Sequence, residues 1–177
     1  MFQLPPAPTW DGLHPLIIHF PIVLLLIAPL FVVIGAALSP QRSKSFFISA
    51  LILMVLGTAS TFVAIETGEA AGKIASRTPE INRILQQHEQ LAERTRLSFS
   101  ILTLLFAGLL LLPRILKREG RMFTAVLPIV FLVIYGGATV LLANTAHNGG
   151  RLVHEFGVQA LVAPTPGEPA QTSKSGD

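Results

Sequence analysis

Five histidines are the residues of this chain with the most evident chemistry: His14, His19, His88, His147 and His154. A neutral imidazole nitrogen is a common ligand of haem iron, copper and zinc. The chain has no cysteine, which excludes thiolate metal sites, disulfides and covalently attached c-type haem. Any cofactor is therefore expected to depend on imidazole, with the carboxylates Glu66 and Glu69 as further candidate metal ligands.

The elements that carry these histidines are expected to be transmembrane helices. Hydrophobic residues make up 51% of the 177 residues and charged residues 13%, against about 25% in a typical soluble domain. A spanning helix needs about 20 apolar residues. Four segments approach or exceed that length: residues 15–38, 46–65, 97–112 and 122–146. We therefore predict an all-α integral membrane protein, a four-transmembrane-helix bundle in contact with membrane lipid and with no nucleic-acid partner.

Residues 1–161 are expected to form this membrane domain. The tail, residues 162–177, is rich in Pro, Gly, Ser and Thr and is expected to be disordered. No Lys or Arg precedes the first apolar segment, so it does not resemble a secretory signal.

Basic residues predict the orientation of the bundle. The two short links, residues 39–45 and 113–121, together hold six Lys and Arg residues, which favours the cytoplasmic side. Both termini and the long link 66–96 are then expected on the outer side. We predict a multi-pass protein of the bacterial inner (cytoplasmic) membrane with periplasmic termini, and all five histidines at its outer end.

The long link is expected to be helical. Thr78 is a suitable N-cap, Pro79 suits the first helical position, and Glu80 suits the positive end of the helix dipole. The second helix is expected to extend through residues 66–75, and the third to start near Pro79. Helices 2 and 3 would then form an outer helical hairpin extension.

Counting along each helix at 1.5 Å per residue brings three histidines to one level. His14, His88 and His147 all lie roughly 36 Å above the cytoplasmic boundary. Glu69 is expected near that level, and His19 and Glu66 about one turn deeper. The metal candidates are therefore His14, His19, His88, His147, Glu66 and Glu69.

Each histidine also has a simpler interpretation. His14 precedes Pro15 and could cap the first helix, and His19 could bond to a carbonyl that Pro21 leaves free. Pro15 and Pro21 mark two helix starts, so the stretch between them could form a short, bent first turn. His88 lies on an apolar stripe and could be a core histidine.

The interpretation of the two C-terminal histidines depends on where the fourth helix is expected to end. His147 would end that helix and could act as a cation at its C-terminus. Gly149 and Gly150 are expected to break the helix, so His154 would be interfacial or exposed.

The constellation fits three kinds of function. The favoured one is b-type haem, one or two groups with bis-histidine ligation, serving electron transfer. The best candidate ligands are His19, His88 and His147, followed by His14 and then His154. Copper or zinc held by the same His/Glu cluster is the second, and a cofactor-free structural or assembly subunit is the third. No nucleophile–base pair is evident, so catalysis by this chain alone is not expected.

The haem interpretation also needs small residues where the ring would pass. They are available in the second and fourth helices, where ordinary helix packing is the alternative explanation. These residues are Gly57, Ala59, Gly136, Gly137 and Ala138.

The stretch "LHPLIIHFPI" (13–22) resembles the L-H-P-x-x-x-H-F-P signature of the DUF2231 family, bacterial predicted membrane proteins with a domain of unknown function. "ETGEAAG" (66–72), the "HE" at His88 and "HNGGRLVHEFGV" (147–158) are similar to later motifs of that family. The resemblance covers residues 13–158 and implies four spans in a bacterial membrane. It does not by itself imply a chemical reaction. From the histidines we expect an electron carrier inside a larger respiratory or photosynthetic complex.

Overall fold

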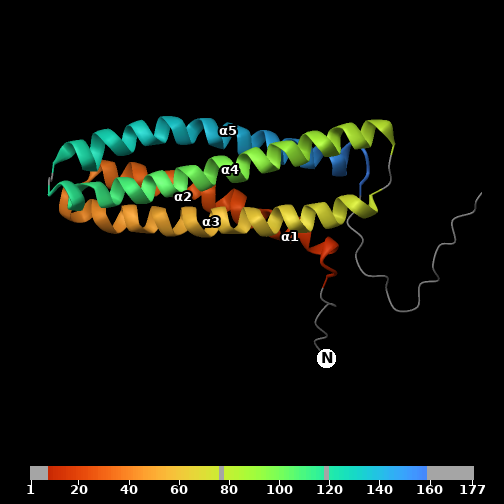
Figure 1. The fold of residues 1–177 in the computed structure, drawn as a ribbon, viewed down its shortest axis with the longest axis horizontal. Coiled ribbons are helices and arrows are strands. Elements are labelled where there is room, and N and C mark those ends of the chain that lie inside the picture. Colours follow the sequence, from red (N-terminus) through yellow and green to blue (C-terminus); the bar gives the residue numbers. More distant parts are fainter. Residues whose placement is uncertain (1–7, 76–77, 118–119, 159–177) are drawn as a thin grey trace, which may run out of the picture.

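The computed structural model describes residues 8–75, 78–117 and 120–158, apart from the side chain of residue 114. The predicted disordered tail lies outside these residues. The described elements are η1 (Asp11–Leu13), α1 (His14–Ile17), α2 (His19–Ala37), α3 (Pro40–Ile74), α4 (Pro79–Leu116), η2 (Met122–Val126, a π-helical segment) and α5 (Leu127–His154). The four long helices run alongside one another, and α1 lies against α3 (Figure 1).

The predicted membrane bundle is confirmed. Within the described ranges, four stretches are long and apolar enough to cross a membrane: Asp11–Ala37, Pro40–Ile74, Pro79–Pro113 and Met122–His154. Large apolar side chains such as Leu104 and Val133 are exposed on the outside of the bundle, where lipid would contact them. The chain is therefore a four-span, multi-pass membrane protein.

Aromatic residues fill the core of the bundle. Phe99, Phe106 and Phe131 are buried around Tyr135. The Tyr135 hydroxyl donates to the Leu25 carbonyl at 2.7 Å.

This hydrogen bond has a specific cause. The normal helical donor to the carbonyl of Leu25 would be residue 29, which is Pro29 and has no N–H. Tyr135 of α5 thus supplies the donor that α2 lacks.

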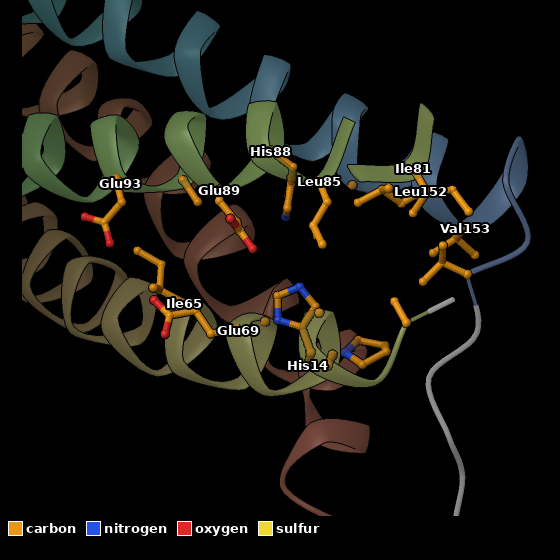
Figure 2. A pocket seen from close by; sticks show the side chains of 18 residues that line it. His14, Ile65, Glu69, Ile81, Leu85, His88, Glu89, Glu93, Leu152 and Val153 are labelled. Carbon is orange, nitrogen blue, oxygen red and sulfur yellow. The ribbon is translucent and has the colours of Figure 1, made fainter. Parts of the chain in front are cut away.

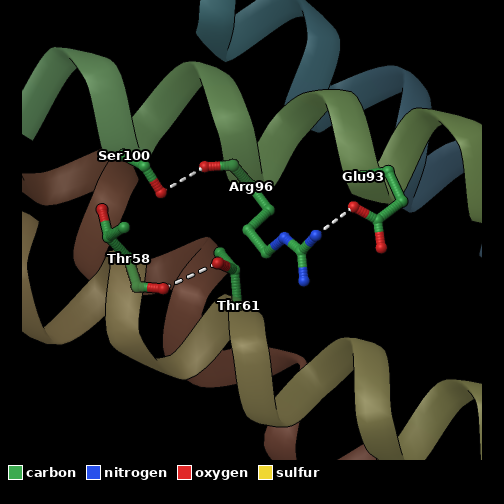
Figure 3. A network of polar contacts seen from close by, with 5 residues as sticks. All are labelled: Thr58, Thr61, Glu93, Arg96 and Ser100. Carbon is green, nitrogen blue, oxygen red and sulfur yellow. Dashed lines mark hydrogen bonds and ion pairs between the residues drawn. The ribbon is translucent and has the colours of Figure 1, made fainter.

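Polar side chains lie between α3 and α4. Thr58 and Thr103 share a hydrogen bond of 2.9 Å. The Ser100 hydroxyl donates to the Arg96 carbonyl, and Arg96 pairs with Glu93 (Figure 3). The described buried side chains leave no polar atom without a hydrogen bond, as an apolar environment requires.

The start of α4 agrees with the prediction, whereas a bend in the first span is not evident. The Ile81 amide donates to Thr78 Oγ1 at 3.2 Å, and Pro79 opens α4, so Thr78 is the N-cap. α1 ends at Ile17 and α2 begins at His19, but Ile18 between them keeps helical backbone angles (φ −58°, ψ −24°), so the predicted bend of this first turn stays a prediction. His14 does not cap α1, because no side-chain hydrogen bond caps that helix.

The predicted end of the fourth helix near Ala146 is wrong. α5 continues through Gly149 and Gly150 to His154. Its last turns are held by packing, since Leu152 is buried in a small cluster with residues of α4. Tertiary burial thus overrides the weak helix propensity of two glycines. The outer hairpin of helices 2 and 3 stays a prediction; α5 packs beside α4 along the same region.

Candidate functional site: a histidine pair in a cavity

A cavity of about 140 Å³ lies between α3 and α4, with α1 and the end of α5 also on its wall (Figure 2). Its lining is mostly apolar or small, with two histidines and three glutamates. The lining residues are His14, Pro15, Ile65, Gly68, Glu69, Ala71, Gly72, Ala75, Ile81, Leu85, His88, Glu89, Ala92, Glu93, Gly149, Leu152, Val153 and Val158. We call this end of the bundle the histidine end.

His14 is held by α3. It lies at the start of α1, and its Nδ1 bonds to the Ala64 carbonyl at 2.9 Å. Nδ1 also lies 3.2 Å from Thr67 Oγ1, whose own proton is given to the Val63 carbonyl at 2.9 Å. A carbonyl can only accept, so Nδ1 carries the proton and Nε2 keeps its lone pair in the neutral ring.

His88 is held in the same way by α5. Its Nδ1 bonds to the Thr145 carbonyl at 3.0 Å. The Thr145 hydroxyl bonds in turn to that of Thr95 at 2.8 Å, which ties α5 to α4. The carbonyl again fixes the proton on Nδ1 and leaves Nε2 free. Metal-bound histidines are commonly oriented by this kind of hydrogen bond.

The two rings form a close pair. The ring centres of His14 and His88 are 6.4 Å apart, and the ring planes are nearly perpendicular at 84°. Figure 2 shows the rings pointing toward one another from α1 and α4. In the neutral ring, each Nε2 presents a lone pair of electrons. The pair therefore suits a bound group that accepts electron pairs, such as a metal ion.

Glycines lie against both rings. A Cβ atom on Gly68 would be 2.8 Å from Cε1 of His14, and one on Gly149 would be 3.0 Å from Cε1 of His88. Side chains at these positions would push the rings from their places. The two glycines are therefore part of the site.

Glutamates line one part of the cavity. Glu69 and Glu89 are both exposed, whereas Glu93 pairs with Arg96, whose guanidinium lies 5.0 Å from the ring centre of Phe62. Glu66 is exposed and does not line the cavity. Within the described residues, no group of three or more His, Asp or Glu side chains is arranged to hold a metal ion.

The other three predicted histidine ligands lie elsewhere. His19, His147 and His154 are exposed, and none of them lines the cavity. His147 points away from the core because it lies five residues, roughly 140° around α5, from the buried Leu142. The structure thus brings together His14 and His88, and leaves His19 and His147 outside the pair.

The small residues predicted to flank a haem ring lie away from the cavity. Gly57 faces Leu24 and Leu25 and permits close packing of α2 on α3. Apart from the adjoining residues and backbone of α5, no described atom lies within 4 Å of a Cβ placed on Gly136 or Gly137. The glycines that do contact the rings, Gly68 and Gly149, were not assigned to the site from sequence.

The fold and the site define a class: a four-span helical membrane protein with an anchored histidine pair at one end. The model of the family described as "Predicted membrane protein (DUF2231)" matches residues 11–161, and the chain belongs to this family. No curated protein and no solved structure matches the chain.

Proposed function

We propose that this protein binds one b-type haem through His14 and His88 and serves in electron transfer. The observation that carries the proposal is the pair itself. Two imidazoles on facing elements are each fixed through Nδ1 by a backbone carbonyl, with ring centres 6.4 Å apart.

The separation would suit two imidazoles that hold one iron between them. Imidazoles bound through Nε2 at about 2 Å on opposite sides of one ion have ring centres about 6 Å apart. A haem iron takes its other four ligands from the ring nitrogens, so two side chains suffice. A bare structural zinc ion needs about four protein ligands, which is more than the pair supplies.

The other residues that line the cavity are suited to a flat apolar ring, but the cavity volume is too small for one. Gly72, Ala71 and Ala92 give small surfaces beside the histidines, and Leu85 and Leu152 give apolar ones. At about 140 Å³ the cavity is smaller than a haem, so binding requires the apolar side chains around the pair to move while the two histidines keep their separation. Bound there, haem would supply reversible one-electron storage, while the chain fixes the iron and limits water.

A copper or zinc ion is the second candidate. The observation that favours it is that Glu69 and Glu89 line the same cavity as the two imidazoles. Carboxylate oxygen and imidazole nitrogen together are a common ligand set for zinc.

The proposed location is the bacterial inner membrane with both termini periplasmic. The described basic residues of the two short links are Arg42, Lys44, Lys117 and Arg121, at what we call the basic end. The positive-inside rule favours the cytoplasmic side for this end. The histidine end would then face the periplasm, where partner subunits of a respiratory or photosynthetic complex could exchange electrons with it.

A spectrum with metal analysis tests the proposal. Full-length protein, purified in mild detergent from cells supplied with a haem precursor, should show a Soret band and an α band that sharpens on reduction, with equimolar iron. A colourless preparation without iron contradicts haem binding. Equimolar copper or zinc would support the second candidate, and a sample without any metal would support a cofactor-free subunit.

A further inference from the structure

A second, larger cavity lies at the basic end of the bundle, at the left in Figure 1. Its volume is about 530 Å³, and it lies between α3 and α4 beside η2. Its lining includes Phe47 and Leu51 of α3, Leu110 of α4 and Phe123 of η2. The wall is therefore largely apolar and is built from two neighbouring spans.

The rim of this cavity carries positive charge. Lys44 is exposed and lines it, while the hydroxyls of Ser43 and Thr124 already donate to the carbonyls of Pro40 and Gly120. Among the lining residues that the structure describes, none carries a carboxylate. The Asp and Glu residues within the described ranges all lie toward the histidine end; Glu119 is outside those ranges.

We infer that this cavity binds one anionic phospholipid, with an acyl chain between α3 and α4 and the phosphate at Lys44. The apolar wall opens toward the surroundings of the bundle, where acyl chains are the available apolar groups. Basic pockets between spans are suited to acidic lipid headgroups, because the cation lies at the level of the phosphate. The inference does not depend on any cofactor at the histidine pair.

Two lipids that differ only in headgroup test this assignment. Full-length protein in detergent is stripped of lipid and titrated with phosphatidylglycerol or phosphatidylcholine of identical acyl chains, and bound lipid is counted by native mass spectrometry. One favourable cation contact predicts about fivefold tighter binding of phosphatidylglycerol. Equal binding of the two lipids would overturn the proposal.

Matched substitutions locate the site. Lys44→Gln should remove the preference for phosphatidylglycerol, whereas Arg42→Gln, two residues away and outside the cavity lining, should retain it. Equal loss in both variants would show a general charge effect and contradict the assignment. Millimolar inorganic phosphate that displaces the lipid completely would assign the site to a free anion instead.

The acyl-chain part is tested separately. Ala107→Phe directs a large ring into the cavity and should weaken binding of both lipids, while Leu105→Phe on the exposed face should not. Ala107→Leu gives a smaller version of the change if the Phe variant does not fold. Unchanged lipid binding by a folded Ala107 variant would overturn the proposed position of the acyl chain.

Discussion

His14 and His88 lie in different helices, yet their ring centres are 6.4 Å apart and their rings are nearly perpendicular. Neither ring is held by its own helix. The carbonyl that orients His14 belongs to Ala64 of α3, and the one that orients His88 belongs to Thr145 of α5. Three long helices must therefore be in register before the pair exists.

Removing either ring of the pair should weaken or abolish the proposed cofactor binding. His14→Ala or His88→Ala removes one of the two proposed haem ligands, so the reduced haem bands should disappear or shift in the absorption spectrum. His147→Ala is the matched control, because His147 is exposed and outside the cavity. Unchanged bands in both pair variants, or bleaching by His147→Ala alone, would refute the assignment of the ligands.

The glycines beside the rings give a graded prediction. Gly68→Ala places a Cβ 2.8 Å from the His14 ring, so the ring should move and cofactor retention should fall strongly. Gly149→Ala meets His88 at 3.0 Å and should have a smaller effect. Retention is measured as the ratio of Soret to protein absorbance.

Gly137→Ala is the control for this series, because its added Cβ would have no neighbour within 4 Å beyond the adjoining part of α5. It should leave cofactor retention unchanged and stabilise the helix by about 0.5–1 kcal/mol. If Gly68→Ala retained as much cofactor as Gly137→Ala, the close approach of residue 68 to the His14 ring would have no effect on cofactor binding.

The packing of α2 on α3 depends on Gly57. Gly57→Ala would place a Cβ 2.8 Å from Cγ and Cδ2 of the fully buried Leu25, which has no room to move. Overpacking of this kind costs about 1–3 kcal/mol of unfolding free energy. Gly108→Ala, with open space around it, should cost little or nothing. Thermal unfolding of both variants in one detergent gives the comparison, and equal midpoints would contradict the close contact.

The hydrogen bond from Tyr135 to Leu25 can be tested by a double-mutant cycle. Tyr135→Phe leaves the Leu25 carbonyl without a donor and should destabilise the protein by about 1–2 kcal/mol. Pro29→Ala restores a backbone N–H four residues after Leu25. Tyr135→Phe should therefore cost less in the Pro29→Ala background. Equal costs in both backgrounds, measured by thermal unfolding, would show that the hydroxyl does not replace the missing amide.

The sequence by itself determined the class of fold, because the features involved are local. A span requires a run of apolar residues, and the runs could be counted directly. The N-cap at Thr78 and the interruption between α1 and α2 are likewise set by neighbouring residues: Pro79 follows the cap, and Pro21 has no N–H for the carbonyl of Ile17. Counting along the helices also brought His14 and His88 to the same height.

Only the tertiary structure decided which histidines meet. Height along a helix says nothing about the direction in which a side chain points, and His147 reaches the level of His88 while pointing away from the core. The continuation of α5 past Gly149 likewise could not be predicted from neighbouring residues, because it depends on the burial of Leu152 against α4. The site arises from the rotation and register of packed helices, and these are set by contacts between residues far apart in the chain.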